Sequence, residues 1–439
     1  MRQREKLSPI SPRLMSGVVI LGLTGQLAWT VENMYLNVFI FETLTDSPHV
    51  IALMVALGAL TATLATLFLG AWSDRAGTRR PFIVIGYLLW GAVTATFGLV
   101  HAGPGMAIAG AVTAIILLDC VMSFFGAGAN DAAFNAWVTD NTDDSNRGRI
   151  DAVLQIMPMV AMLVVFGALD PLTKDGHWFL FFAIIGICTA GIGVLAWPLA
   201  KDAPTLKKST EGYFSSVILG LRPSSIRRNP SLYLTLAAWA IIGTSTQVFL
   251  PYIIVYLQRR LQIDAYALVL AAVIISASIL SVLGGRIIDR VGKVRSILPA
   301  TAIMIAGYLG VFFARTTWPV ILCGTIMFAG FMLSVAAIAA EVRDNTPAQH
   351  AGMVQGLRMI AMVLIPMWIG PTVGATVISS AAETYTDLGQ VKQVPTPWIF
   401  IAAAVVALFV LVPMAGLRYI QKHDVHTVGQ DPRSSSPSA

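Results

Sequence analysis

Charged residues are scarce in this chain of 439 residues. Asp, Glu, Lys and Arg together make up 12% of it, whereas 56% of the residues are apolar. A soluble domain usually carries about 25% charged residues, so the composition excludes a water-exposed surface of this size. Lipid is the solvent that tolerates so apolar a surface, and the composition therefore indicates a membrane protein.

Cysteine is rare as well. Cys120, Cys188 and Cys323 lie inside apolar runs, and the chain contains no C-x-x-C pair. This pattern excludes a disulfide framework and the usual zinc spacing, and we expect no bound metal or cofactor. The motifs of serine hydrolases, zinc proteases and phosphate-binding loops are also missing. We therefore expect no catalytic residues, no enzyme activity and no nucleic-acid partner.

Long apolar runs are abundant instead. A membrane-spanning helix needs about 20 mostly apolar residues, and the alternation typical of membrane β-barrel strands is not the pattern here. The spans are predicted near residues 14–41, 49–71, 81–101, 107–137, 149–169, 177–199, 231–257, 265–285, 296–314, 318–341, 352–378 and 398–417. The fold class is thus an all-α membrane protein with twelve transmembrane helices.

A long connection after the sixth span divides the chain. We predict an N-terminal six-helix bundle over residues 1–199 and a C-terminal six-helix bundle over 231–420. The linker 200–230 is basic, and its segment 212–221 is expected to lie flat on the membrane as an amphipathic helix. Residues 421–439 are expected to form a disordered cytoplasmic tail, because they end in a polar, Ser- and Pro-rich sequence.

Basic residues predict the orientation, because Lys and Arg favour cytoplasmic loops. Of the 29 basic residues, 23 fall on the side that carries both termini, 5 fall on the other side, and Arg358 lies inside the eleventh span. Both termini are therefore expected in the cytoplasm, and the plasma (inner) membrane is the expected location. Six tryptophans are predicted to mark the membrane boundaries, with Trp178, Trp318 and Trp398 outside and Trp72, Trp137 and Trp197 inside.

Two connecting segments occur twice. Gly70, Asp74, Arg75, Gly77 and Arg80, between spans 2 and 3, recur 215 residues later as Gly285, Asp289, Arg290, Gly292 and Arg295. Between spans 4 and 5, Asp140 and Gly148 recur 204 residues later as Asp344 and Gly352. Both repeats join equivalent spans, so the two halves are predicted to share one architecture.

The first of these segments resembles the signature loop of the major facilitator superfamily. That resemblance implies two bundles around a central cavity lined mainly by spans 1, 4, 7 and 10, and transport by alternating access. It also implies a cytoplasmic gate built on these loops. We assign to this gate Gly70, Asp74, Arg75, Gly77, Arg79, Arg80, Asp140, Arg147, Gly285, Asp289, Arg290, Gly292 and Asp344.

A second resemblance concerns the branch of the family. The segment from Asn130 to Asp140, and the segment from Gln26 to Asn33 in span 1, are similar to those of the glycoside and sucrose-type cation symporters. Span 2 lacks the paired acids of sodium-coupled melibiose-type carriers, which leaves the proton as the expected coupling ion. Span 11 holds only a Gly370-Pro371 fragment of an antiporter-like motif, and this argues against drug efflux.

Carboxyl groups at membrane depth are the first functional candidates, because burying them is expensive. Glu32 in span 1 and Asp119 in span 4 are predicted to carry the coupling proton. For Glu32 the alternatives are a sugar-hydroxyl acceptor or a buried, protonated structural acid. Asp119, Ser123, Gly126 and Asn130 are spaced along one helix face.

Other polar residues in the spans are predicted to contact substrate. They are Gln26, Trp29, Asn33, Asn37, Ser123, Asn130, Asp131, Thr244, Gln247, Tyr252 and Arg358. Ordinary packing remains the alternative for the span 7 run Thr244–Gln247 and for Trp29 and Trp239, which could otherwise stack on a sugar. A structural or gating role is the alternative for Asp131. For Arg358 the alternative is pairing with Glu341 or Asp344.

These observations favour a secondary active transporter of a small polar solute. Proton-coupled symport of a sugar or glycoside is the leading hypothesis, and a proton-driven exporter of drugs or amphipathic compounds is the alternative. A non-transporting receptor or sensor is an alternative of another class. The expected partners are a small-molecule substrate and the lipid bilayer, and we expect the protein to be a monomer.

Overall fold

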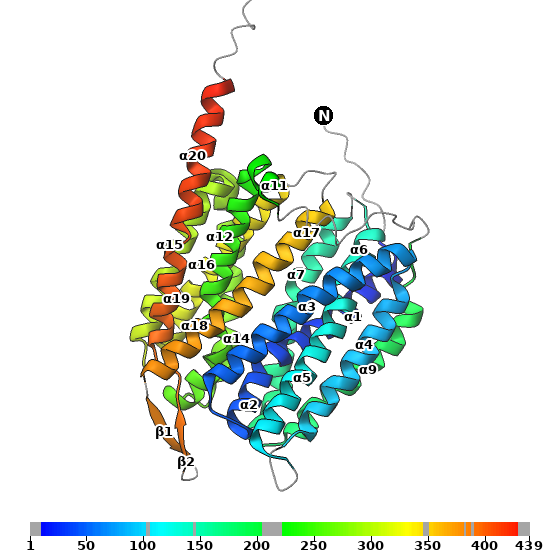
Figure 1. The fold of residues 1–439 in the computed structure, drawn as a ribbon, viewed down its shortest axis with the longest axis vertical. Coiled ribbons are helices and arrows are strands. Elements are labelled where there is room, and N and C mark those ends of the chain that lie inside the picture. Colours follow the sequence, from blue (N-terminus) through cyan, green and yellow to red (C-terminus); the bar gives the residue numbers. More distant parts are fainter. Residues whose placement is uncertain are drawn as a thin grey trace, which may run out of the picture.

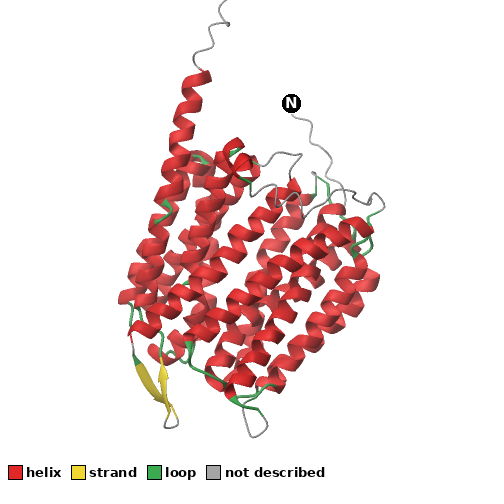
Figure 2. Ribbon diagram, in the orientation of Figure 1, coloured by secondary structure: helices red, strands yellow, loops and turns green. Residues whose placement is uncertain are grey.

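The computed structural model describes residues 10–101, 106–143, 146–203, 222–345, 351–381, 383–387 and 390–428. These residues are mostly helical, with one β-hairpin (Figure 2). Among these described residues, twelve helices are long and apolar enough to cross a membrane. The predicted all-α fold with twelve spans is thus confirmed, and the apolar length of each run was sufficient to find it.

The first half contains spans 1 to 6. Its elements, in chain order and with several spans divided by π- or 3₁₀-helical turns (η), are α1 (Pro12–Thr30), η1 (Val31–Leu36), α2 (Asn37–Thr43), α3 (Pro48–Ala76), α4 (Arg80–Thr96), η2 (Phe97–Leu99), α5 (Ile108–Gly126), η3 (Ala127–Phe134), α6 (Asn135–Asp140), α7 (Arg147–Val164), η4 (Val165–Leu169), α8 (Asp170–Lys174) and α9 (Trp178–Leu199).

The second half contains spans 7 to 12. Its elements are the short α11 (Pro223–Arg228), α12 (Pro230–Gln247), η5 (Leu250–Tyr252), α13 (Ile253–Val255), η6 (Tyr256–Arg260), α14 (Tyr266–Val291), α15 (Lys293–Phe313), α16 (Thr317–Asp344), α17 (Ala351–Met359), η8 (Ile360–Leu364), α18 (Ile365–Ala381), α19 (Trp398–Leu408) and α20 (Leu411–Val428). Strands β1 (Thr384–Asp387) and β2 (Gln390–Gln393) pair antiparallel before span 12, with Thr384 opposite Gln393.

Two bundles meet along a central seam. Helix α3 of the first half packs along α18 of the second, and α7 contacts α14 (Figure 1). Because the number of spans is even, α1 begins and α20 ends on the same side, which we call the inner side. The hairpin lies on the opposite, outer side (Figure 1). The inner side is the one that the basic residues predict to be cytoplasmic.

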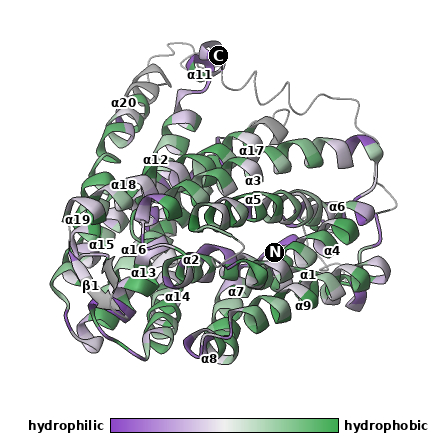
Figure 3. Cartoon of the chain, turned by 60° about the horizontal axis from the view of Figure 1, so that its bottom comes forward, coloured by the Kyte–Doolittle hydropathy of each residue, from purple (hydrophilic) through white to green (hydrophobic). Residues whose placement is uncertain are grey.

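Most residues of the long helices are apolar, and hydrophilic residues gather near the connecting segments (Figure 3). Trp72, Trp197, Trp318 and Trp398 are exposed as the belt prediction requires. The same prediction is wrong for Trp137 and Trp178, which are buried. Trp137 lies against Gly17, which leaves room for the indole, and its Nε1 donates to the carbonyl of Lys201 over 2.7 Å.

Two predicted segments fall beyond the described residues. The predicted amphipathic helix at 212–221 and the last eleven residues, 429–439, are not described. Helix α20 continues to Val428, past the predicted end of the second bundle at residue 420.

Candidate functional site

The two bundles are in contact at their outer ends. Arg259 Nη2 donates to Glu42 Oε1 over 3.2 Å, the backbone N–H of Gln393 donates to Asp46 Oδ2 over 2.7 Å, and Ser379 Oγ lies 3.2 Å from His49 Nε2. Each pair joins a residue of the first half to one of the second. The structure therefore shows a state whose outer side is held shut by polar contacts.

Asp170 forms the most buried of these contacts. It opens α8 at the outer end of span 5, and only 2% of its surface is exposed. Its Oδ1 accepts from Tyr35 of its own half over 2.9 Å and from Tyr266 of the other half, while Oδ2 pairs with Lys174 Nζ over 3.0 Å. Lys174 also donates to the carbonyl of Asp264 over 3.0 Å. One carboxylate thus ties both bundles together.

A cavity of about 430 Å³ lies between the bundles, on the inner side of these contacts. Spans 1, 5, 7, 8, 10 and 11 line it. Its walls are mostly apolar, with methionine side chains from both halves and aromatic side chains from the second half. They include Met34, Met159, Met162, Trp239, Phe328, Phe331, Met332 and Met362. Ligand pockets usually combine such walls with a few polar groups that orient the ligand.

The polar lining is sparse. Gln155, Thr246, Gln247 and Ser278 contribute the polar side chains of the described wall. Gln247 belongs to the predicted substrate contacts. Thr246 and Gln247 are the last two residues of α12, ahead of Pro251. The cavity thus receives amide and hydroxyl groups at a few positions on an apolar background.

The predicted coupling acids lie inside the first bundle, outside this lining. Glu32 sits on the π-helical turn η1 and is 9% exposed, and Asp119 on α5 is 2% exposed. Ser123 Oγ donates to Glu32 Oε1 over 2.8 Å. Within the described part of the chain, Glu32 Oε2 and Asp119 Oδ1 are buried without a hydrogen-bond partner. Span 1 and span 4 thus bring two carboxyl groups into one buried cluster.

Gly58 on α3 closes this cluster from span 2. A Cβ placed on Gly58 would lie 2.6 Å from Asp119 Oδ2 and 3.3 Å from Ser123 Oγ. The first of these separations is shorter than any ordinary carbon–oxygen contact, so only glycine leaves the carboxyl in place. Close helix approach at small residues is a usual device of membrane bundles.

A second polar cluster lies nearer the inner side of the same bundle. Asn130 Nδ2 donates to the Tyr87 hydroxyl over 2.6 Å, and Tyr87 donates to the carbonyl of Leu21 over 2.8 Å. Asp131 interacts with the side chain of Trp29. Asn130 lies on the π-helical turn η3, which starts at Ala127, and its side chain lies against Gly25 of span 1 as well as Tyr87 of span 3. Its placement on one helix face with Asp119 and Ser123 stays a prediction.

Two more of the predicted residues of span 1, Asn33 and Asn37, hydrogen-bond to their own helix. Asn33 Nδ2 donates to the carbonyl of Trp29, and Asn37 Nδ2 to the carbonyl of Asn33, both over 2.8 Å. Asn37 is fully buried, and Gln26 is partly buried. With Trp29, Ser123, Asn130 and Asp131, they lie outside the described lining of the cavity in this state.

Some polar residues of span 7 form hydrogen bonds within the second bundle, and another takes part in the contact between the two bundles. Thr244 Oγ1 donates to the carbonyl of Ala240, and Ser245 lies 2.9 Å from the Tyr308 hydroxyl. The Tyr252 hydroxyl shares its proton between the carbonyls of Pro48, at 3.1 Å, and Pro371, at 2.9 Å. Tyr252 was predicted to contact substrate, but in this structure it joins span 7 to span 2 of the other bundle.

Arg358 lies beside the cavity wall. Its guanidinium carbon is 5.3 Å from the centroid of the Trp239 ring, within the range of a cation–π contact. Its Nη2 lies 3.9 Å from the sulfur of Met362. Trp239 and Met362 both line the cavity.

The first signature loop ties three spans of one bundle together. Arg79 donates to Asp140 Oδ2 over 3.0 Å and to Ser73 Oγ over 2.6 Å, and it pairs with Asp74 over 2.5 Å. Burial lowers the pKa of Arg79, but its bonds to Asp140 and Asp74 more than offset this, so the pKa is raised. Asp202 accepts from the backbone amides of Arg79 and Arg80 at the start of α4.

Neighbouring residues complete this loop. Gly77 ends α3 with φ 67°, a left-handed conformation that favours glycine. The Arg80 guanidinium lies 3.8 Å from the centroid of the Trp197 ring, and Arg147 donates to Thr142 Oγ1 over 3.3 Å. Arg75 is exposed, and a Cβ placed on Gly70 would lie 3.6 Å from Ala132 Cβ.

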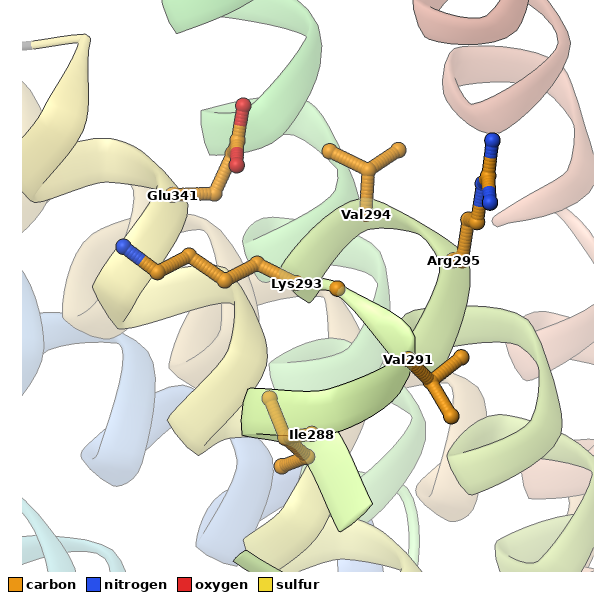
Figure 4. Close-up of a pocket in the computed structure, with 7 residues that line it drawn as sticks. Ile288, Val291, Lys293, Val294, Arg295 and Glu341 are labelled. Atoms are coloured by element: carbon orange, nitrogen blue, oxygen red, sulfur yellow. The ribbon is translucent and has the colours of Figure 1, made fainter. Parts of the chain in front are cut away.

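The second signature loop is built differently. By the repeat, Val294 stands where the first loop has Arg79, and the ion pair to the next loop is made instead by Lys293 with Asp344. A cavity of about 430 Å³ lies here, lined by Lys293, Arg295 and Glu341 among others (Figure 4). Gly292 has φ 97°, Gly285 faces open space and Arg290 is exposed, while the side chain of Asp289 is not described.

Sequence reasoning missed much of the cavity wall. Gln155, Met159, Met162, Phe328 and Phe331 carry no motif, and their spacing is that of any buried helix face. It also missed Asp170, which was counted neither as coupling nor as gating residue. The sequence signal that could have identified Asp170 was a carboxyl residue followed by a proline at the end of a predicted span.

Comparisons with known proteins agree with this architecture. The model of the Major Facilitator Superfamily matches residues 18–371. No curated protein sequence matches the chain. Among solved structures, the chain is similar to the nucleoside transporter NupG, with 14% identity, 93% of this chain and 99% of that chain covered, and a TM-score of 0.69.

Two further solved structures show the same fold. A peptide transporter of the POT family in an auto-inhibited state has 15% identity, coverage of 93% and 97%, and a TM-score of 0.66. The xylose transporter XylE from E. coli has 15% identity, coverage of 90% and 97%, and a TM-score of 0.63. Identities this low establish the fold alone.

Proposed function

Since the chain belongs to the major facilitator superfamily, and is therefore a secondary transporter and not an enzyme, we propose that it moves an amphipathic organic solute by proton-coupled alternating access. The solute would bind in the cavity between the bundles. The outer contacts around Asp170 would open as the inner side closes.

The cavity lining carries this proposal. A sugar presents hydroxyl groups on all sides, and each one buried without a partner costs free energy. The described wall offers Gln155, Thr246, Gln247 and Ser278 for that purpose, and the remainder is methionine, aromatic and aliphatic. Methionine adapts its shape to varied apolar ligands. The lining thus favours the amphipathic substrate class over the sugar or glycoside that the sequence led us to expect.

The buried carboxyl cluster supports proton coupling. An ionised carboxylate without a full set of partners is expensive at membrane depth. Glu32 and Asp119 each have one such oxygen within the described residues. A group in this setting is suited to hold a proton while buried and to release it once the bundles rock and water enters. The hydrogen bond from Ser123 to Glu32 links spans 4 and 1, whose movement would release the proton.

Transport in proteoliposomes tests the proposal. The purified protein is reconstituted with a pH-sensitive dye inside, and fluorescent amphipathic compounds and radiolabelled disaccharides are offered under an imposed pH gradient. We expect the amphipathic compounds to move with protons, and Asp119→Asn and Glu32→Gln to abolish gradient-driven accumulation while substrate exchange persists. Asp175→Asn, an exposed acid at the outer surface, is the matched control.

Two results would contradict the proposal. Proton-linked movement of disaccharides without movement of amphipathic compounds would restore the sugar hypothesis. Unchanged gradient-driven accumulation in Asp119→Asn and Glu32→Gln would remove the carboxyl cluster from coupling.

A further inference from the structure

We propose that the first bundle binds an anionic phospholipid at the inner side of the membrane. One acyl chain of this lipid would lie in an apolar groove between spans 2, 3 and 4, and its phosphate would contact Trp72 and Arg75. The groove shares no residue with the described lining of the solute cavity. The lipid site is therefore a separate feature that goes beyond the proposed transport function.

The groove is a cavity of about 340 Å³ between three spans of one bundle. Helices α3 and α4 both pack on α5 and η3 (Figure 1), and the groove lies where these elements meet. At its inner end, the rings of Trp72 on α3 and Phe82 on α4 meet edge to face, with their centroids 5.3 Å apart. Apart from the indole N–H of Trp72, every side chain of the described lining is apolar, as an acyl chain requires.

Buried glycines form the floor of the groove. A Cβ placed on Gly86 would lie 2.4 Å from Ala129 Cβ, and one placed on Gly128 would lie 2.1 Å from Leu69 Cδ1. Both distances are far below ordinary contact, so these spans approach closely because the two positions carry no side chain. The rim is open instead, since Trp72 is 63% exposed. A lipid chain can therefore enter the groove from the bilayer.

Two hydrogen-bond donors lie at the inner end of the groove. Arg75 follows Trp72 by three residues on α3, and residues with this spacing are neighbours on a helix surface. Arg75 is exposed, and among the described residues neither its guanidinium nor the Trp72 indole N–H has a polar partner. The adjacent acid, Asp74, pairs with Arg79. The inner end of the groove thus presents a positive charge that no described carboxylate balances.

The chemistry of a phospholipid matches both parts of this site. Lipid tails are as apolar as leucine side chains, so the groove determines where a chain lies without choosing among lipids. The choice comes from the headgroup, because a guanidinium forms charge-assisted hydrogen bonds to phosphate and tryptophan is favoured at the level of the headgroups. Phosphatidylglycerol brings a net negative charge to Arg75, whereas the ammonium group of phosphatidylcholine cancels that charge. The site therefore favours the anionic lipid.

Quenching of tryptophan fluorescence by brominated lipids tests the site. The purified full chain is reconstituted in phosphatidylcholine vesicles that contain increasing fractions of dibrominated phosphatidylglycerol or dibrominated phosphatidylcholine. Because the chain has ten tryptophans, the signal of Trp72 is measured as the difference between the unmodified protein and Trp72→Phe. We expect phosphatidylglycerol to quench Trp72 at a roughly fivefold lower mole fraction, as one arginine near an anionic headgroup allows.

Variants locate the two parts of the site. Arg75→Gln should make the two lipids equal, while quenching by phosphatidylcholine persists and shows that Trp72 is still in place. Arg75→Lys should keep most of the preference, because phosphate also binds a point charge. Arg290→Gln is the matched control, since Arg290 is the exposed repeat equivalent of Arg75 in the second half, and it should leave the quenching of Trp72 unchanged. Ile85→Phe narrows the groove and should weaken quenching by both lipids.

The contrary outcomes are distinct. Equal quenching of Trp72 by the two lipids in the unmodified protein, or an unchanged preference in Arg75→Gln, would overturn the assignment of the headgroup. The same loss of preference in Arg290→Gln would assign it to the general surface charge instead of this site. Unchanged quenching in Ile85→Phe would place the acyl chain outside the groove. Solute transport in proteoliposomes is measured separately, so its failure would leave the lipid site standing.

Discussion

The Ser123 hydroxyl on span 4 donates a hydrogen bond to Glu32 Oε1 on span 1, 91 positions away in the sequence. Both residues are buried, and Asp119 lies on the same helix face as Ser123, one turn earlier. This bond therefore ties Glu32 to the helix that carries Asp119, the other carboxyl group proposed to carry the proton. It also places them between spans of a single bundle, away from the solute cavity.

Removing that hydroxyl should impair coupling. In Ser123→Ala, Glu32 loses the partner of Oε1 while Oε2 already has none among the described residues. We expect a destabilisation of about 1–2 kcal/mol and a shifted pH dependence of gradient-driven transport. Thermal unfolding and transport at several pH values measure these effects. Thr113→Val removes an exposed hydroxyl on the same helix and should leave both unchanged, and a normal pH profile in Ser123→Ala would contradict the assignment.

A methyl group at position 58 should displace Asp119. Because the added Cβ would lie 2.6 Å from Asp119 Oδ2, Gly58→Ala forces the carboxyl or α3 to move, at a cost of about 1–3 kcal/mol. We expect lower thermal stability together with loss of proton-driven accumulation. Gly191→Ala is the matched control, since a Cβ there meets nothing within 4 Å. Full coupling in Gly58→Ala would show that the position of Asp119 does not matter.

Neutralising Asp170 should open the outer side. Asp170→Asn loses the ion pair with Lys174 and weakens the bonds from Tyr35 and Tyr266. A loss of about 2 kcal/mol from the closed state would shift the equilibrium toward the outward-open state by a factor of roughly 30. Spin labels at the exposed outer positions 177 and 316 report this as a longer distance between the bundles.

Two further variants complete that experiment. Tyr266→Phe removes only the bond that comes from the second bundle, so it should give a smaller shift in the same direction. Asp175→Asn, a nearby exposed acid, should give none. If Asp170→Asn leaves the distance distribution unchanged, the outer closure does not depend on this carboxylate.

The fold could be predicted from the sequence because each span is a long apolar run and because two loops repeat in order. The site could be predicted only in part. Glu32 and Asp119 stand out as charges in apolar segments, but their proximity depends on Gly58 and on a π-helical turn that no local pattern signals. Asn130 also stands out as a polar residue in a span, but its hydrogen bond to Tyr87 of span 3 could not be predicted from spacing along one helix. The cavity wall combines ordinary apolar residues from six spans, and only their packing identifies them.

The two signature loops should differ in what they contribute to stability. Arg79 has only 7% of its side chain exposed and bonds to Asp74, Asp140 and Ser73, so it connects spans 2, 3 and 4. Removing one member of a buried charge network costs roughly 3–5 kcal/mol, and Arg79→Gln should lower the thermal unfolding temperature markedly. Lys cannot replace the planar fork, so Arg79→Lys should recover little.

The repeated loop provides the control for this last prediction. The pair of Lys293 with Asp344 has exposed fractions of 37% and 59%, and solvent screening limits such pairs to roughly 0–1 kcal/mol. Lys293→Gln should therefore change the unfolding temperature very little. Similar losses in Arg79→Gln and Lys293→Gln would mean that burial does not distinguish the loops. A large loss in Arg79→Gln alone would show that the two halves share a sequence repeat while only the first uses it to hold a bundle together.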